Sequence, residues 1–217
     1  VYQSHHIEKY RSALQNLDDQ ALCFRCICSR KDLKGKDIYP GTCRDQNFSM
    51  NIDAAIRIRA PESEYGFHDS RHGDYQQLLS RSVGDFIIAR RNGFAAYQLA
   101  VVVDDDAMAV TNVVRGADLI DNTPRQLFLM NCLRISPPQY LHVPVVTEKS
   151  GVKLSKHIHS TAIDNRYPAQ NLSVALDLLG QEPPRIRNIR GLLNWAISHW
   201  RPESIPQIQK IDNFVSI

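Results

Sequence analysis

Residues 110–134 limit the fold of this chain more than any other stretch. They open on a β-branched run, Val110–Val114, which predicts a short buried strand. Arg115 stands where this strand ends, and open α/β sheets bind ligands at the carboxyl ends of their strands. Thr123 and Pro124 are typical of the start of a helix, and apolar residues follow them at helical spacing. The stretch therefore predicts an α/β fold that presents an arginine just ahead of a helix.

Apolar runs upstream predict further strands. Ala54–Ala60 alternates apolar residues with arginines, which predicts a half-buried strand whose arginines point outward. Asp85–Arg91 predicts a second strand, and Asn92-Gly93 is a strong signal for a hairpin turn after it. Tyr97–Val103 is almost continuously apolar, which predicts a strand buried on both faces. The polar, turn-rich segment Pro61–Tyr75 predicts an exposed loop.

Helical periodicity appears near both ends of the chain. Ile7–Leu17 places apolar residues at helical spacing, which predicts an amphipathic helix. Tyr140–Val146 predicts another short strand. Beyond it the composition shifts, and Leu172–Leu179 and Ile189–Trp200 predict a small helical appendage.

The composition excludes several classes of protein. With 217 residues, the chain is long enough for one sizeable core or for a core with a small satellite domain. Its 43% hydrophobic and 23% charged residues are ordinary for a globular protein, and no apolar run is long enough to cross a bilayer. The net charge of +3 permits a nucleic-acid-binding face without demanding one. Five cysteines, an odd number with three in Cys23–Cys28, indicate a metal site in a reducing compartment rather than a disulfide framework.

Three cysteines share one short segment. One residue separates Cys26 from Cys28, and Cys43 follows a Pro-Gly turn that can bring it back to them. Three thiolates close in space favour a structural zinc ion, which takes four ligands in a tetrahedron. General preferences favour Cys or His as the fourth ligand, and the candidates are Cys23, Tyr39, His68 and His72. The alternative is that the three are buried free thiols, which are common.

A loop that opens at Gly151 carries two lysines in the order Lys153, Leu154, Ser155, Lys156. Lysines on such a loop can neutralise phosphate charge that develops in a transition state. The alternative is an ordinary solvated loop.

The segments FIIARRNGFAAYQLAVVVDDDAMAVTNVVRGADLIDNTPRQLFL, LHVP and KLSK follow one another within Phe86–Lys156. Together they resemble the second half of the catalytic domain of a glutamyl-type class I aminoacyl-tRNA synthetase, and KLSK resembles the KMSKS loop of that class. The resemblance implies a Rossmann-type α/β catalytic domain whose N-terminal part, with the HIGH-like motif, is expected to precede Val1. It also implies a catalytic portion at 1–147 with a zinc-bearing insertion at about 22–84, followed by the KLSK loop and a helical stem-contact-like subdomain at 148–217.

The cysteine segment narrows the resemblance further. Cys26, Cys28, Tyr39 and Cys43 resemble the Cys, Cys, Tyr, Cys zinc site of the glutamyl-Q tRNA(Asp) synthetases, the short paralogues without an anticodon-binding domain. The resemblance therefore selects Tyr39 as the fourth zinc ligand.

Membership of this family implies a specific reaction. L-Glutamate is activated with ATP, accompanied by Mg²⁺, to glutamyl-adenylate, and glutamate is then transferred to queuosine at the wobble position of tRNA(Asp). By motif, Tyr97 and Arg115 match the glutamate-binding residues, and Lys153, Leu154, Ser155 and Lys156 match the ATP-binding loop, with both lysines catalytic. A cytoplasmic monomer without membrane contact is expected.

Two other functions remain open from the sequence. The chain is alternatively a fragment of an ordinary glutamyl-tRNA synthetase that charges tRNA(Glu). It is otherwise a non-catalytic zinc-containing module that binds RNA, although such a module has no use for an amino-acid pocket and a phosphate loop.

Overall fold

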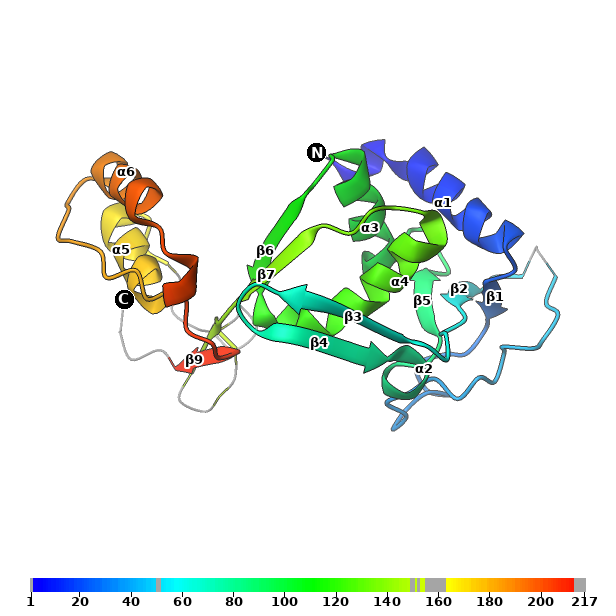
Figure 1. Cartoon of the computed structure of the whole chain (residues 1–217). Helices are drawn as coiled ribbons and strands as arrows, with labels where there is room; N and C mark the ends of the chain where they lie inside the picture. Colours follow the sequence, from blue (N-terminus) through cyan, green and yellow to red (C-terminus); the bar gives the residue numbers. More distant parts are fainter. Residues whose placement is uncertain (1, 50–51, 149–150, 152, 155–162, 213–217) are drawn as a thin grey trace. The chain divides into compact units, whose positions relative to one another are not determined.

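The computed structural model describes residues 2–49, 52–148, 151, 153–154 and 163–212 of the chain, which is drawn in Figure 1. The chain forms two compact units whose segments alternate along the sequence. The first unit comprises Val1–His68, Asp74–Val113 and Asp121–Gln139. The second comprises Asp69–Gly73, Val114–Ile120 and Tyr140–Ile217.

The α-helices among the described residues are α1 Ile7–Asp19, α2 Leu79–Ser82, α3 Tyr97–Ala107, α4 Thr123–Leu133, α5 Pro168–Leu178 and α6 Ile189–His199. The strands are β1 Cys23–Cys26, β2 Ala55–Ile58, β3 Glu64–Asp69, β4 Gly73–Leu78, β5 Phe86–Ala89, β6 Asn112–Gly116, β7 Gln139–Val143, β8 Val145–Thr147 and β9 Lys210–Asp212. Their orders in the sheets are β1-β2-β5, β4-β3-β7-β6 and β8-β9.

The core of the first unit lies between one small antiparallel sheet and three helices. Strand β2 pairs with β1 and with β5, and α1, α3 and α4 pack together beside these strands (Figure 1). Leu17, Ile58, Leu99 and Leu129, from α1, β2, α3 and α4, are fully buried there. The contribution of each to stability comes from apolar surface removed from water.

Several predicted elements are confirmed. Helix α1 covers the predicted amphipathic segment, and residues 110–134 contain strand β6 followed by helix α4. The turn at Asn92-Gly93 is also present, because the Gly93 N–H donates to the Arg90 carbonyl and Ala89 pairs with Ala95 across it. The predicted burial of β6 is wrong, however, since Val114 is 65% exposed. Strand β6 lies at the end of its sheet order, so it is covered less than an inner strand.

The segment Tyr97–Val103 is a helix rather than the predicted strand. A short apolar run fits a buried strand and a buried helix equally well, and its length alone decides poorly between them. Here the helix continues through Ala107, and Asp104 lies on its buried face with Leu99 and Val103. The predicted end of the element at Val103 is therefore wrong as well.

The N-terminal segment and α1 supply the hydrogen-bond partners of the buried Asp104. The hydroxyl of Tyr10 donates to both carboxylate oxygens at 2.7 and 2.9 Å, and Nδ1 of His6 lies 2.7 Å from one of them. The amide of Gln3 donates to the other oxygen at 3.1 Å. Burial alone raises the pKa of Asp104, but the hydrogen bonds with His6, Tyr10 and Gln3 outweigh it and lower that pKa below 3.8.

Replacing Asp104 by asparagine is expected to lower the unfolding free energy at pH 7 by about 1–3 kcal/mol, because buried donors lose a charged acceptor. A lowered pKa in the folded state stabilises the fold above the ordinary carboxyl pKa of 3.8, and this stability is lost as the pH falls further. Denaturant unfolding at pH 7 and below pH 4 should therefore show the variant and the natural chain converging in acid. The control is Asp106→Asn on the exposed side of the same helix, and equal effects of the two changes would contradict this account.

Two further expectations are corrected. The predicted loop Pro61–Tyr75 contains β3 and the start of β4. The turn between the two strands ends at Gly73, whose φ is +77°. Apart from the buried Asp69 at the end of β3, the residues of both strands are exposed or half-buried, so the strands lack the apolar run that would mark them in the sequence. The predicted outward direction of Arg57 is also wrong, since it is 7% exposed and donates to the Asp85 carbonyl at 2.8 Å.

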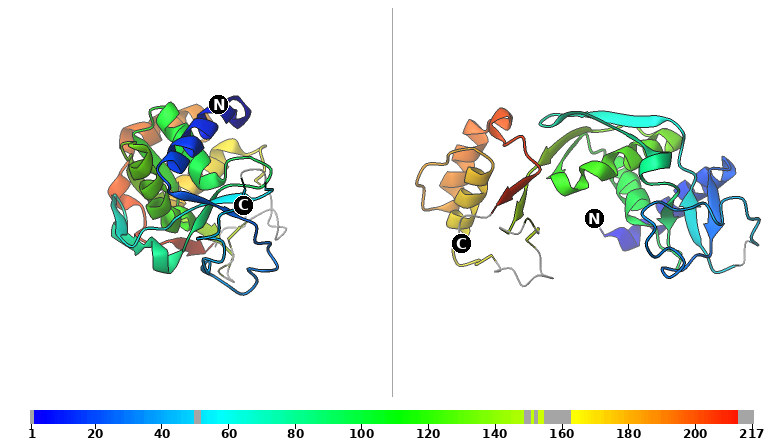
Figure 2. Two further views of the ribbon diagram at one scale, coloured as in Figure 1. Left: turned by 90° about the vertical axis from the view of Figure 1, so that its right-hand side faces the viewer. Right: turned by 90° about the horizontal axis from the view of Figure 1, so that it is seen from below.

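The second unit contains a helical pair and a small parallel sheet. Helices α5 and α6 pack side by side, as Figure 1 and the right-hand view of Figure 2 both show. Strands β8 and β9 pair in parallel, and the buried hydroxyl of Thr147 donates to Asp212 at 3.0 Å. Within the described residues, no helix combines the length and the apolar character that crossing a membrane requires.

Candidate functional site

The structure brings three cysteines of the first unit together. Their Sγ atoms, in Cys26, Cys28 and Cys43, all lie within 4.8 Å of one another, and Cys26 and Cys43 are buried. Cys26 is the last residue of β1, which fixes its place against β2. Phe24, Phe48 and Tyr39 surround the group and form a small apolar cluster with it. All the cysteines of the chain are free thiols.

The spacing of these atoms fits a tetrahedral metal. Zinc with Zn–S bonds of about 2.3 Å and Zn–O bonds of about 2.0 Å sets sulfur atoms about 3.8 Å apart and sulfur and oxygen about 3.5 Å apart. The Sγ atoms of Cys28 and Cys43 are 3.6 Å apart. The Oη of Tyr39 lies 3.5 Å from Cys26 Sγ and 3.9 Å from Cys28 Sγ. Cys26, Cys28, Cys43 and Tyr39 could therefore hold one zinc ion.

Arg57 supplies a positive charge beside this cysteine cluster. Its guanidinium carbon lies 3.9 Å from the centre of the Tyr39 ring. Burial alone raises the pKa of Cys26, but hydrogen bonding with Tyr39 and Arg57 outweighs it and lowers that pKa to about 7. A thiolate is thus accessible near neutral pH, which is the form that binds metal.

The other candidates for a fourth ligand lie elsewhere. Cys23 packs against the main core, and burial followed by the charges of Asp18 and Cys132 raises its pKa to about 12. Nδ1 of His68 lies 2.7 Å from Asp74 on an exposed part of the β3–β4 hairpin. Among the described His, Cys, Asp and Glu residues, the group whose ligand atoms lie close enough to bind one metal ion consists of the three cysteines. It includes neither His68 nor His72.

Arg115 lies on β6 in the second unit, next to strand β7. Its Nε donates to Nε2 of His142 at 3.0 Å, and its guanidinium carbon lies 5.5 Å from the centre of the Tyr140 ring. Tyr140 and His142 are alternate residues of β7, so their side chains share one face of the sheet and stack at 11°. The arginine thus contacts both an imidazole and an aromatic ring.

The imidazole of His142 is held in turn by Asp69, the last residue of β3. Both side chains are completely buried, and Nδ1 of His142 lies 2.7 Å from Oδ2 of Asp69. The backbone N–H of His142 donates to the same oxygen at 2.9 Å. Three segments of the chain therefore meet at this Asp69–His142–Arg115 cluster.

The remaining predicted site residues are distributed over both units. Tyr97 is the first residue of α3 in the first unit and is 47% exposed, so its predicted position on a strand is wrong. Lys153 pairs with Thr147 in an isolated bridge, and its Nζ lies 2.5 Å from Asp118. The N–H of Leu154 donates to the Val146 carbonyl at 3.1 Å. Ser155 and Lys156 lie outside the described residues.

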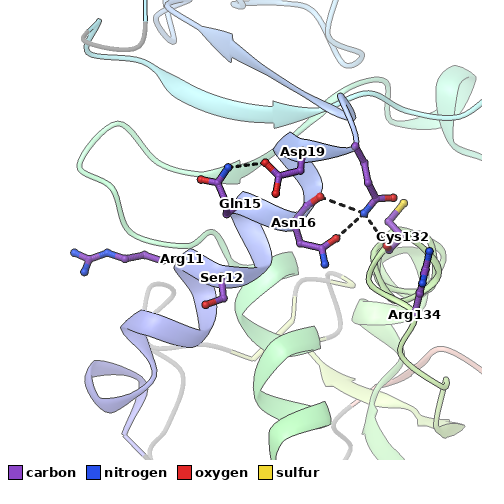
Figure 3. A pocket seen from close by; sticks show the side chains of 8 residues that line it. Arg11, Ser12, Gln15, Asn16, Asp19, Cys132 and Arg134 are labelled. Carbon is purple, nitrogen blue, oxygen red and sulfur yellow. Dashed lines mark hydrogen bonds between the residues drawn. The ribbon is translucent and has the colours of Figure 1, made fainter.

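A pocket of about 760 Å³ lies on another part of the first unit. Residues of α1 and the end of α4 line it, and Figure 3 shows Asn16 of α1 and Cys132 of α4 in this lining. The amide of Gln20 donates to the Cys132 carbonyl at 3.1 Å. Within the described part of the chain, none of the predicted site residues belongs to its lining. The pocket is open and carries both charges and amides, and we assign it no role.

Sequence reasoning missed Asp69 and His142 as parts of a site. Asp69 fell in the expected loop, and His142 was placed in a strand without a role. The available signal was a histidine inside an otherwise apolar strand, because a buried ionisable group needs a partner. Nothing in the sequence near His142 indicates that this partner lies 73 residues upstream.

Comparison with known proteins gives the chain a clear kinship. The family model described as tRNA synthetases class I (E and Q), catalytic domain, matches residues 1–191. The chain is 46% identical over 209 residues to the glutamyl-Q tRNA(Asp) synthetase of Pseudomonas aeruginosa (strain LESB58), covering 94% of this chain and 71% of the relative. It is 43% identical over 218 residues to the glutamyl-Q tRNA(Asp) synthetase of Thiobacillus denitrificans, covering 95% of this chain and 72% of the relative.

A solved structure shares the fold. The glutamate-tRNA synthetase from Elizabethkingia anophelis superposes with a TM-score of 0.75 at 14% sequence identity. The match covers 97% of this chain and 52% of that one, so the chain spans about half the length of the solved protein. At this low identity the likeness shows the fold alone.

Proposed function

The chain belongs to the tRNA synthetases of class I (E and Q), a family of ligases, and we propose that it attaches L-glutamate to queuosine in tRNA(Asp) with ATP. In the first step, a carboxylate oxygen of glutamate displaces pyrophosphate from the α-phosphorus of ATP and forms glutamyl-adenylate. In the second, a hydroxyl of the wobble-position queuosine attacks the activated carbonyl, and AMP leaves. Neither step needs a covalent bond to the enzyme, so positioning and charge stabilisation carry the catalysis.

The observation that carries the proposal is kinship with glutamyl-Q tRNA(Asp) synthetases over almost the whole chain. The geometry at Arg115 agrees with it. A guanidinium offers a planar fork that matches a carboxylate, and here it lies near the end of β6, braced by His142 and Tyr140. We assign Arg115 and Tyr97 to glutamate binding.

The lysines of the KLSK loop are assigned to the phosphates of ATP, which enters together with Mg²⁺. The backbone of Lys153 is held by the β-bridge to Thr147. Its side chain forms an ion pair with Asp118, a surface carboxylate. Because exposed ion pairs contribute little, this pair can exchange for contacts with triphosphate at small cost. Lys156 is assigned by motif to the same task, with Leu154 and Ser155 completing the loop.

A structural zinc ion at Cys26, Cys28, Tyr39 and Cys43 is part of the proposal. The spacing of the ligand atoms and the nearby charge of Arg57 support it. When bound, the ion cross-links the end of β1 to the segment that follows it, up to Cys43. A cytoplasmic, monomeric enzyme remains our expectation.

A charging assay with the natural full-length protein tests the proposal. Labelled glutamate and ATP are supplied with queuosine-containing tRNA(Asp), with queuosine-free tRNA(Asp) or with tRNA(Glu). We expect label on the queuosine-containing tRNA(Asp) alone. Label on tRNA(Glu) would instead identify an ordinary glutamyl-tRNA synthetase. Absence of both label and glutamate-dependent pyrophosphate release would leave the zinc-containing RNA-binding module.

A further inference from the structure

The Asp69–His142–Arg115 cluster contains a completely buried carboxylate that accepts hydrogen bonds on both oxygens. Oδ1 of Asp69 accepts the backbone N–H groups of Arg71 and His72, both at 2.9 Å. Oδ2 accepts the backbone N–H of His142 and faces the His142 ring at 2.7 Å. Burial alone raises the pKa of Asp69, but the hydrogen bonds from His142, His72 and Arg71 outweigh it and lower that pKa. Both carboxylate oxygens of Asp69 therefore act as hydrogen-bond acceptors.

The acceptor character of Asp69 decides which nitrogen of His142 carries the proton. Burial lowers the pKa of His142, so the ring is neutral near pH 7 and holds a single proton. A carboxylate 2.7 Å from Nδ1 requires that this proton sit on Nδ1. Nε2 then bears a lone pair and accepts the Nε–H of Arg115, which lies 3.0 Å away. The opposite tautomer would set two N–H groups against each other.

A hydrogen bond at Nε has a direct effect on the guanidinium. Nε lies in the plane of the group, so fixing its N–H direction also fixes the plane that contains both terminal nitrogens. The Tyr140 ring lies 5.5 Å from the guanidinium carbon and adds a second contact to the group. An arginine restrained in this way loses less conformational entropy when it binds a planar anion.

We propose that His142, held in the Nδ1–H tautomer by Asp69, is a positioning residue that orients Arg115 for the carboxylate of glutamate. The inference rests on the proposed function of Arg115 as a glutamate ligand. His142 itself touches no substrate in this account. Its predicted effect is therefore confined to glutamate affinity and does not extend to ATP.

A matched pair of substitutions separates positioning from packing. The amide of His142→Asn takes the place of Nδ1 and can still donate to Asp69, but it is too short to reach Arg115. The amide of His142→Gln takes the place of Nε2, and its oxygen can accept from Arg115. We expect His142→Asn to raise KM for glutamate about tenfold, the value of one lost hydrogen bond to a charged group, with KM for ATP unchanged within about twofold. His142→Gln should recover most of this loss, and thermal melts should show whether both variants fold.

The outcomes are distinguishable from failure of the proposed function. If Arg115→Ala leaves KM for glutamate unchanged, the proposed role of Arg115 is wrong. If Arg115→Ala raises it strongly while His142→Asn and His142→Gln behave alike, the positioning role is wrong. Nitrogen-15 chemical shifts of the His142 ring in the natural protein give an independent test that needs no variant. Nδ1 protonated and Nε2 bare is the expected result, and a proton on Nε2 would overturn the inference.

Discussion

Replacing Arg115 by alanine is expected to lower kcat/KM for glutamate by about a thousandfold, mainly through KM. A substrate carboxylate that loses its paired cation loses about 4 kcal/mol of binding, which corresponds to this factor. The fold should survive, because Arg115 lies on β6 at the end of its sheet order and is only half-buried. Steady-state charging of queuosine-containing tRNA(Asp) at varied glutamate gives the measurement.

Two companion variants sharpen this result. Arg115→Lys keeps the charge but loses both the planar fork and the Nε–H that binds His142, so we expect a loss between those of alanine and the natural residue. Arg11→Ala removes an exposed arginine that pairs with Glu8 on α1 and should leave kinetics unchanged. Arg115→Ala with unaltered KM for glutamate would remove the basis for placing the substrate at this residue.

Replacing Cys43 by serine is expected to abolish zinc binding and to lower the unfolding free energy by about 3 kcal/mol or more. Cys43 is 2% exposed and closes the cysteine cluster from the far end of a long connection. Among the described residues between Cys26 and Ala55, neither helix nor strand supports this connection. The proposed metal cross-link would therefore supply most of the order of this connection. Metal content by mass spectrometry and thermal melts with and without a chelator give the readouts.

The chain offers its own control for this substitution. Cys132→Ser replaces a free thiol on α4 that lies outside the cysteine cluster, so metal content should stay at about one equivalent. Zinc retained by Cys43→Ser would show that Cys43 is not a required ligand, and zinc absent from the natural protein purified without chelator would show that the three cysteines are ordinary thiols.

Local patterns predicted the parts of the fold that depend on neighbours in the sequence. The periodicity of Ile7–Leu17 and of residues 123–133 reports which side of a helix faces the core, and both helices are present. Tyr97–Val103 was mistaken for a strand because its apolar run is compatible with either element. What favours a helix is the buried Asp104, whose hydrogen-bond partners include Tyr10 of α1 and His6 just before it. These contacts are visible only after the two helices have packed.

The candidate site residues also divide into those that the sequence predicted and those that it did not. Cys26 and Cys28 are separated by one residue, and a Pro-Gly turn precedes Cys43, so the sequence could predict that the three lie together. The resemblance pointed to Tyr39, whose Oη the structure places 3.5 Å from Cys26 Sγ. The inward direction of Arg57 was missed because an alternating strand predicts that its charged face is solvated.

By itself, the sequence determined the kinship of the chain, the cysteine cluster and the position of Arg115 near a strand end, since each follows from the order and spacing of residues along the chain. The tertiary structure alone decided how Arg115 is held. Asp69 and His142 meet only because β3 and β7 pair in parallel, with Asp69 opposite Tyr140. The buried carboxylate of Asp69 then keeps the proton of His142 on Nδ1. Nε2 of His142 is therefore the acceptor for the Nε–H of Arg115. No local pattern encodes a contact of this kind, because its energy depends on burial, which exists only in the folded chain.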